Sequence, residues 1–210
     1  MLARVQRGLE QLYRVDTGVA IDDFLIDAAA RDQLSPQRRP REQLLAVEDD
    51  GEMALAVYID PGALANLARH DPADRLGAHN LGDFLLAIEG TSHFIYAICC
   101  ARAERPVTQL ELELQAEIDK YVTCLLVGEP APASSAALRH RLFADPSYEP
   151  DLDADERARY RAANDNAQRY TAWLEAAYVV PGRIPEMLGE LRRFYRRGLA
   201  AKLADIARAA

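Results

Sequence analysis

Two short apolar runs, each bounded by polar residues, lie close together in the N-terminal half of the chain. The runs QLLAVE (43–48) and EMALAVYI (52–59) flank Asp49-Asp50-Gly51. In the second run, drawn as a strand, Leu55, Val57 and Ile59 share one face, and the other face carries Ala54, Ala56 and Tyr58. Asp-Gly between such runs is typical of a tight β-hairpin, because glycine supplies the positive φ that the turn needs. A lone hairpin is marginally stable in water, so we expect it to pack against helices that follow.

Most of the remaining chain repeats its apolar residues every three or four positions, which predicts helices. Thr108 and Glu111 have the spacing of a capping box, and Asp60-Pro61 has the residues of a helix start. Pro181-Gly182 separates two long helices and so predicts an αα-hairpin. We predict helices over 2–13, 62–69, 108–127, 136–143, 153–178 and 184–207, a strand over 19–26, a loop over 32–41 and a linker over 128–135.

The most apolar segment, 80–103, contains Glu89-Gly90-Thr91-Ser92-His93 in its middle. Drawn as a helix, the segment is apolar on nearly every face, and a helix of that kind is buried. The alternative is a β-hairpin whose strands meet at Gly90-Thr91-Ser92. The period of the apolar residues favours the helix.

These elements together predict an α+β fold that is predominantly helical. A small N-terminal β-hairpin, with 19–26 as a candidate third strand, packs on a helical core, and a C-terminal αα-hairpin completes the domain or extends from it. A chain of 210 residues is long enough to bury such a core. We divide it into a core region, 1–128, and a helical region, 136–210, which either pack as one domain or stand apart.

Charge is unevenly spread along the chain, which has a net charge of −8. Residues 1–130 hold 22 acidic and 12 basic side chains, a net of −10, whereas residues 181–210 hold 3 acidic and 7 basic ones, a net of +4. Nucleic-acid binding depends on Lys and Arg that meet phosphates, so the acidic body argues against it. The basic C-terminal segment is compatible with a local acidic partner.

Cysteine usage and hydropathy indicate a cytoplasmic protein. Cys99, Cys100 and Cys124 lie in apolar segments and lack the spacing of a disulfide framework or a zinc site. The first twenty residues carry charges throughout, and the longest uncharged run of the apolar core, 90–101, is shorter than the roughly 20 residues that span a bilayer. We therefore expect no export and no membrane partner. Abundant Ala and Arg with few Lys indicate a GC-rich bacterial genome.

Glu89 and His93 are the strongest candidates for chemistry. Their i, i+4 spacing places them on one face of a helix, and the next helix offers Glu113 and Glu117 at the same spacing. Carboxylates and imidazole are ligands for Fe, Mn or Zn, and such sites form between the helices of a bundle. The chain has one Glu-x-x-x-His and no second histidine on these helices, which departs from the carboxylate-bridged di-metal pattern.

Three interpretations of this polar group remain open. The favoured one is a structural network, in which Glu89 and His93 pair with each other, with Thr91 or Ser92, or with Lys120, because a buried charge must be paired. The second is a metal or small-ligand site, and the third is acid/base catalysis by the Glu89–His93 pair.

Other motifs carry less weight. Ser92 and His93 point about 100° apart on a helix, and Cys100 lies two turns from His93, so neither forms a nucleophile–base pair. Asp151-x-Asp153-x-Asp155 lacks the later glycine and glutamate of a calcium loop.

Four arginines near the C-terminus form a candidate partner-binding patch. In a helix Arg192 and Arg196 share one face, and Arg193 and Arg197 share another. Such a patch suits a phosphate or an acidic protein surface. The alternative, which we favour, is a solvated face that the acidic body partly neutralises.

No motif in the chain fixes a reaction. The sequence therefore favours a non-enzymatic interaction, assembly or regulatory protein that binds a protein partner or self-associates, for example as a dimer. The alternative is a metal-dependent or small-ligand-binding enzyme that uses Glu89, His93, Glu113 and Glu117. We expect no cofactor in the first case and a transition metal in the second.

Overall fold

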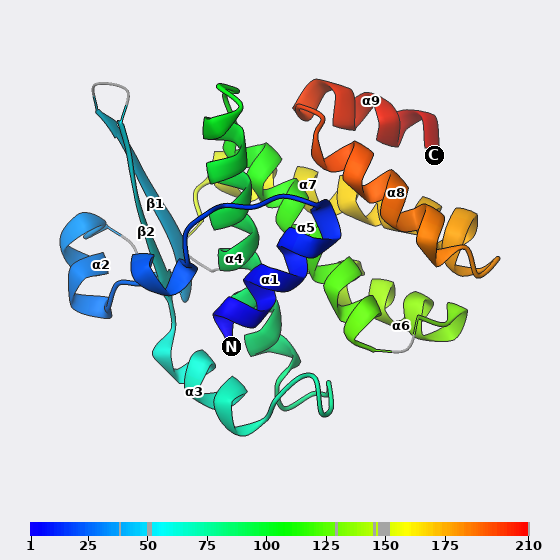
Figure 1. The fold of residues 1–210 in the computed structure, drawn as a ribbon, viewed down its shortest axis with the longest axis horizontal. Coiled ribbons are helices and arrows are strands. Elements are labelled where there is room, and N and C mark those ends of the chain that lie inside the picture. The colour runs from blue at the N-terminus through cyan, green and yellow to red at the C-terminus, as the bar shows by residue number, and fades with distance from the viewer. Residues whose placement is uncertain (38, 50–51, 129, 145, 147–151, 210) are drawn as a thin grey trace.

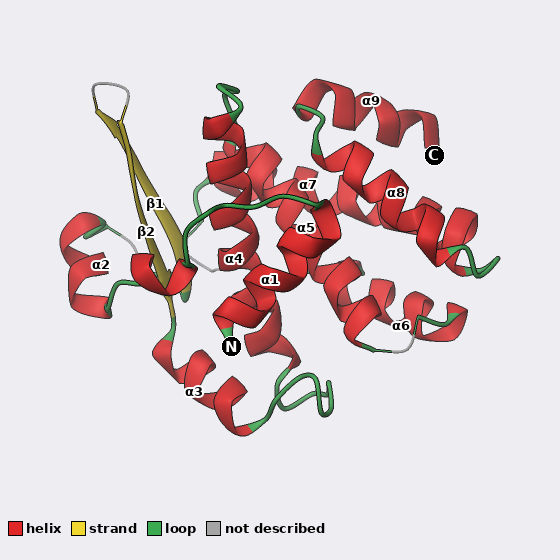
Figure 2. Ribbon diagram, viewed as in Figure 1, coloured by secondary structure: helices red, strands yellow, loops and turns green. Residues whose placement is uncertain are grey.

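Helices dominate the fold, and one small antiparallel sheet stands at its side (Figures 1 and 2). The computed structural model describes residues 1–37, 39–49, 52–128, 130–144, 146 and 152–209. The predicted α+β, predominantly helical class is confirmed. In Figure 1 the sheet lies at one end of the long axis, and the C-terminal helices lie toward the other.

The predicted hairpin forms from β1 (Glu42–Asp49) and β2 (Glu52–Ile59), which pair antiparallel with Glu42 opposite Ile59. Its predicted turn at Asp50-Gly51 lies outside the described residues. Val57 and Ile59 are buried, because one face of the sheet packs on the central helix. The candidate third strand is wrong: its residues form a short 3₁₀ helix, η1 (Ile21–Phe24), followed by a single bridge from Leu25 to Val57.

Three short helices cover the N-terminal half. α1 (Leu2–Tyr13) and α3 (Pro61–Arg69) were predicted, and the Asp60 side chain caps α3 by accepting from the Gly62 amide. The predicted loop over 32–41 is wrong at its start, because α2 spans Ala28–Leu34. The cap of α2 is Asp27, whose side chain accepts from the Ala30 amide.

α4 (Leu81–Arg102) is the central helix, so the hairpin alternative for this segment is wrong. It contacts α1, α3, α5 and both strands. Within the described chain it is the one helix whose length and composition would allow it to cross a membrane, and 72% of its most apolar stretch is buried inside the fold. The helix is apolar on all sides because other elements surround it.

α5 (Gln109–Val127) runs beside α4 and continues the core. The Thr108 side chain accepts from the Glu111 amide, as predicted, but the Glu111 carboxylate bonds Tyr96 and Arg105 and so does not complete the capping box. α6 (Pro132–Phe143) begins inside the predicted linker, with proline in its first turn.

The C-terminal region forms the predicted αα-hairpin and then turns back. α7 (Ala154–Leu174) continues into a π-helical turn, η2 (Glu175–Val179), and α8 (Ile184–Tyr195) returns alongside, with Tyr170 stacked on Phe194 at 4.1 Å. The predicted single helix over 184–207 is wrong, because residues 196–198 separate α8 from α9 (Leu199–Ala209). One hydrophobic cluster draws residues from 1–128 and from 136–210.

Candidate functional site

The two polar pairs predicted on neighbouring helices face each other in the interior. Glu89 and His93 project from α4, and Glu113 and Glu117 project from α5. One nitrogen or oxygen atom from each of Glu89, His93 and Glu113 lies within 4.8 Å of the other two. Glu117 joins this group through Lys120, whose ammonium lies 2.8 Å from it.

The His93 ring lies between two carboxylates. Its Nδ1 is 3.4 Å from Oε1 of Glu42, on β1, and its Nε2 is 3.6 Å from Oε2 of Glu113. The His93 side chain is only 7% exposed, yet neither His93 Nε2 nor Glu42 Oε1 has an aligned hydrogen bond among the described residues. A buried polar atom without a partner is costly, so these two atoms call for an explanation.

Lys120 connects the remaining carboxylates. Its Nζ lies 2.9 Å from Glu89 and 2.8 Å from Glu117. Burial alone would lower the pKa of Lys120, but the charges of Glu117 and Glu89 outweigh burial and raise it. Burial would likewise raise the pKa of Glu89, and the Lys120 charge outweighs it and lowers that pKa.

The other members of the cluster show a shortage of positive charge. Burial raises the pKa of Glu42 and of Glu117. Burial would lower the pKa of His93, but Glu42 and Glu113 outweigh it and raise it well above its usual value. With every group ionised, four carboxylates, one ammonium and one imidazolium give four negative and two positive charges, a net of −2.

Sequence reasoning missed two members of this site. Glu42 comes from the first residue of β1, and its distance from His93 in the sequence left no signal for the contact. Gly90 makes the approach possible, since a Cβ there would lie 3.0 Å from Ile59 Cδ1 and 3.1 Å from Glu42 Cγ. A glycine inside an apolar helix is the one local hint that another element comes close.

Glu89 and His93 approach each other within 4.8 Å, but no hydrogen bond or ion pair joins them among the described residues. Lys120 binds Glu89, as the network interpretation predicted. Thr91 and Ser92 bond elsewhere: the Thr91 hydroxyl donates to the Ala87 carbonyl, and the Ser92 hydroxyl donates to Asp119 at 2.6 Å.

Ser92 belongs to a second buried polar cluster that the sequence did not reveal. Asp119 accepts hydrogen bonds from Ser92, Tyr13 and Gln115, and burial raises the pKa of Asp119 to about 6. Lys202, from α9, is fully buried and donates to the Tyr96 hydroxyl and to Gln115 Oε1, each at 2.7 Å. Burial lowers the pKa of Lys202 to about 7.

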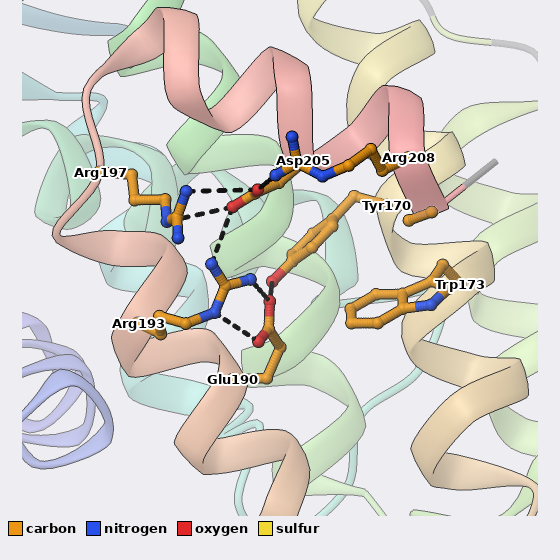
Figure 3. Close-up of a pocket in the computed structure, with 8 residues that line it drawn as sticks. Tyr170, Trp173, Glu190, Arg193, Arg197, Asp205 and Arg208 are labelled. Carbon is orange, nitrogen blue, oxygen red and sulfur yellow. Dashed lines mark hydrogen bonds and ion pairs between the residues drawn. The ribbon is translucent and has the colours of Figure 1, made fainter.

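All four C-terminal arginines of the candidate patch have partners within the chain. Arg193 binds Glu190 and Asp205, and Arg197 binds Asp205, beside a cavity of about 260 Å³ that Tyr170 and Trp173 also line (Figure 3). Arg192 donates to the Leu12 carbonyl, and Arg196 donates to the Tyr13 carbonyl, at the end of α1.

The arginine patch is therefore divided. Arg193 and Arg197 are neutralised by carboxylates of α8 and α9, whereas Arg192 and Arg196 satisfy the last carbonyls of α1 and keep their charge.

Protein-family models, curated proteins and solved structures were compared with this chain, and none of the three comparisons gave a match.

Proposed function

We propose that this protein binds a divalent transition-metal ion in the buried cluster between α4, α5 and β1. His93 Nε2 and the carboxylates of Glu89 and Glu113 are the protein ligands. Glu42 orients the His93 ring, and Lys120 holds Glu89 in place.

One observation carries this proposal above the others. His93 Nε2 is buried, has no aligned hydrogen bond within the described chain, and shares a space of 4.8 Å with oxygens of two carboxylates. A structural network would bring that nitrogen within hydrogen-bond distance of Glu113, yet the two atoms lie 3.6 Å apart, and a buried polar atom without its hydrogen bond costs about 1–3 kcal/mol. A divalent metal ion would displace the proton of the imidazolium, bind the freed nitrogen and offset the surplus negative charge, so that binding releases a proton to solvent.

The donor set favours a transition metal over calcium or magnesium. Imidazole suits Zn, Fe, Cu and Ni, whereas Ca²⁺ and Mg²⁺ prefer sites made only of oxygen. Histidine ligands usually direct their second ring nitrogen at a carboxylate, and His93 Nδ1 faces Glu42 at 3.4 Å. That carboxylate fixes which nitrogen is free to act as the ligand.

The proposed set of three protein ligands would leave a coordination position of the metal open. Three protein ligands are typical of catalytic rather than structural zinc sites, because a coordination position stays open for water or substrate. The side chains of Glu89 and Glu117 are about one-fifth exposed, which gives the cluster one route to solvent. Metal-assisted hydrolysis or hydration of a small substrate is the reaction class that such a site supports best.

Metal binding tests the proposal directly. The protein is stripped with a chelator and then titrated with Zn²⁺, Mn²⁺ or anaerobic Fe²⁺, with calorimetry for affinity and elemental analysis for stoichiometry. We expect about one equivalent of one of these ions. We also expect a rise in melting temperature, since a ligand at 100 times its Kd stabilises the fold by about 2.7 kcal/mol.

Two variants and one control make the assignment specific. His93→Ala should abolish tight binding, and Glu42→Gln should weaken it by about 10- to 100-fold through the orientation of the ring. His140→Ala removes an exposed histidine of α6 and should leave affinity unchanged. Less than roughly a tenth of an equivalent after reconstitution, or equal affinity in the His93 and His140 variants, would refute the metal site.

The interaction function predicted from the arginine patch stays a prediction. Charge reversal at Arg192 and Arg196 tests it by partner capture or by oligomeric state. We rank it below the metal site because the patch residues already bind groups within the same chain.

A further inference from the structure

A second cavity, distinct from the proposed metal site, opens where three helix ends meet. It has a volume of about 450 Å³, within the usual range for small-molecule pockets. The residues that follow α1, the last two turns of α4 and the end of α8 line it. Its lining includes Tyr195, Cys99, Asp16, Arg102, Arg105 and Arg196.

The charge around this cavity is unbalanced toward positive. Arg102 and Arg196 form no ion pair with a carboxylate among the residues that the structure describes, and each donates instead to backbone carbonyls. Arg105 is paired with Glu111 at 2.8 Å, and Asp16 is the one acidic residue in the lining. The cavity of Figure 3 differs in that each of its arginines, Arg193, Arg197 and Arg208, is ion-paired with Glu190 or Asp205.

A buried hydroxyl marks the same cavity. Tyr195 is 4% exposed, and its hydroxyl meets the Cys99 sulfur, a weak acceptor, with no nitrogen or oxygen partner within the described residues. The ring itself is well held, stacked on Tyr13 at 3.9 Å and against the edge of Tyr96 at 4.9 Å. A rigid aromatic wall whose hydroxyl has only a weak acceptor is typical of a surface that contacts a ligand.

We propose that this cavity binds a small organic anion with an apolar body. The apolar part lies against Tyr195, Cys99 and their neighbours, and the anionic head, a carboxylate or phosphate, meets Arg102 and Arg196. The Tyr195 hydroxyl donates to the ligand. Arg102 and Arg196 have donors left over for this, since the hydrogen bonds to carbonyls use only part of each guanidinium.

The competing role for these arginines is helix capping. Arg196 donates to the Tyr13 and Arg14 carbonyls at the end of α1, and Arg102 donates to the Asp16 carbonyl. Capping explains why the arginines are ordered, but it explains neither the burial of the Tyr195 hydroxyl nor the cavity of about 450 Å³ beside it. The two roles are compatible, and they differ in whether an anion is recognised.

The test uses a matched pair of fluorescent probes. 8-Anilinonaphthalene-1-sulfonate joins an apolar body to an anionic head, and N-phenyl-1-naphthylamine has the same body without the charge. We expect saturable binding of the sulfonate, weaker by roughly 10- to 100-fold in Arg102→Gln and by roughly 3- to 10-fold in Tyr195→Phe. Binding of the uncharged probe should change little in Arg102→Gln.

Controls separate recognition from folding. Arg183→Gln removes one positive charge at the far end of α8, where Arg183 pairs with Glu186, and should leave the affinity unchanged. Tyr195→Phe loses only the weak contact with the Cys99 sulfur, so its melting temperature should stay close to that of the wild type. Octanoate and octyl phosphate, used as competitors, identify the preferred head group.

Two results would overturn the proposal. One is equal binding of the sulfonate probe by the Arg102 and Arg183 variants, and the other is failure of both competitors to displace the probe. Neither result bears on the metal site, because the cavity uses none of its ligands.

Discussion

Lys202 gives the sharpest quantitative prediction, because it is fully buried and its direct partners are neutral. Its ammonium or amine bonds the Tyr96 hydroxyl and Gln115 Oε1 at 2.7 Å, and burial lowers its pKa from 10.5 to about 7. Lys202→Met replaces the amine with an apolar chain of similar length. We expect this variant to change how stability depends on pH.

The sign and size follow from proton linkage. Between about pH 7 and pH 10.5 the unfolded chain binds a proton on Lys202 that the folded chain does not hold, so wild-type stability rises with pH. For these two pKa values the gain between pH 7 and pH 9 is about 2 kcal/mol. The variant lacks this gain. The variant also lacks the Lys202 charge, so the pKa of Asp119 rises further in its folded state. That rise makes the variant less stable as the pH increases, which widens the same difference between wild type and variant.

The assay is urea unfolding of both proteins at pH 7, 8 and 9, followed by circular dichroism, in buffers that contain a chelator. The quantity of interest is the difference between the two free energies of unfolding, because the contributions of other titrating groups largely cancel in it. We expect the difference to shift by about 2 kcal/mol toward the wild type between pH 7 and pH 9. Curves that stay parallel would refute the lowered pKa and the burial that causes it.

Two further predictions concern the metal-site region. Gly90→Ala should destabilise the fold by about 1–2 kcal/mol, because the added Cβ would press against Ile59. The control Gly189→Ala lies on an exposed face of α8 with open space around it and should stabilise the fold by roughly 0.5–1 kcal/mol. Equal effects of the two substitutions in thermal unfolding would contradict the close approach of β2 to α4 at Gly90. Lys120→Met should cost about 3–5 kcal/mol in urea unfolding, since it leaves two buried carboxylates without their cation. A loss below about 1 kcal/mol would mean that those carboxylates are protonated or solvated.

Periodic patterns predicted most of the helices and the hairpin, because long amphipathic segments leave a regular signal. The pattern failed where it continued across a break: Leu191, Tyr195, Leu199 and Leu203 keep a helical period although residues 196–198 are not helical. Gly198 was the only local sign of that break. α2 was missed because Leu34 is the one large apolar side chain among its seven residues, which leaves no periodic stripe.

The candidate site could be predicted only in part. Spacing on α4 and α5 brought Glu89, His93, Glu113 and Glu117 to one interface. Glu42 could not be placed, because nothing in the sequence sets the register of the hairpin against α4. Lys202 could not be placed either, since a lysine is rarely fully buried and its helix looked like a continuation of the preceding one.

The chain's only two lysines are both in the interior, and they differ in what surrounds them. Lys120 touches two carboxylates and has a raised pKa, whereas Lys202 touches a hydroxyl and an amide and has a lowered one. The Lys202 cluster therefore approaches neutrality by giving up charge, with Asp119 titrating at about 6 and the lysine at about 7. In the Lys120 cluster both cations are already protonated and four carboxylates remain, so neutrality requires either protons on carboxylates, which the raised pKa values of Glu42 and Glu117 favour, or a cation from outside. A divalent cation would thus stabilise the cluster around His93 and would not stabilise the cluster around Lys202. We therefore expect metal binding to slow hydrogen exchange mainly at the backbone amides of β1 and of the turns of α4 and α5 around His93 and Glu113.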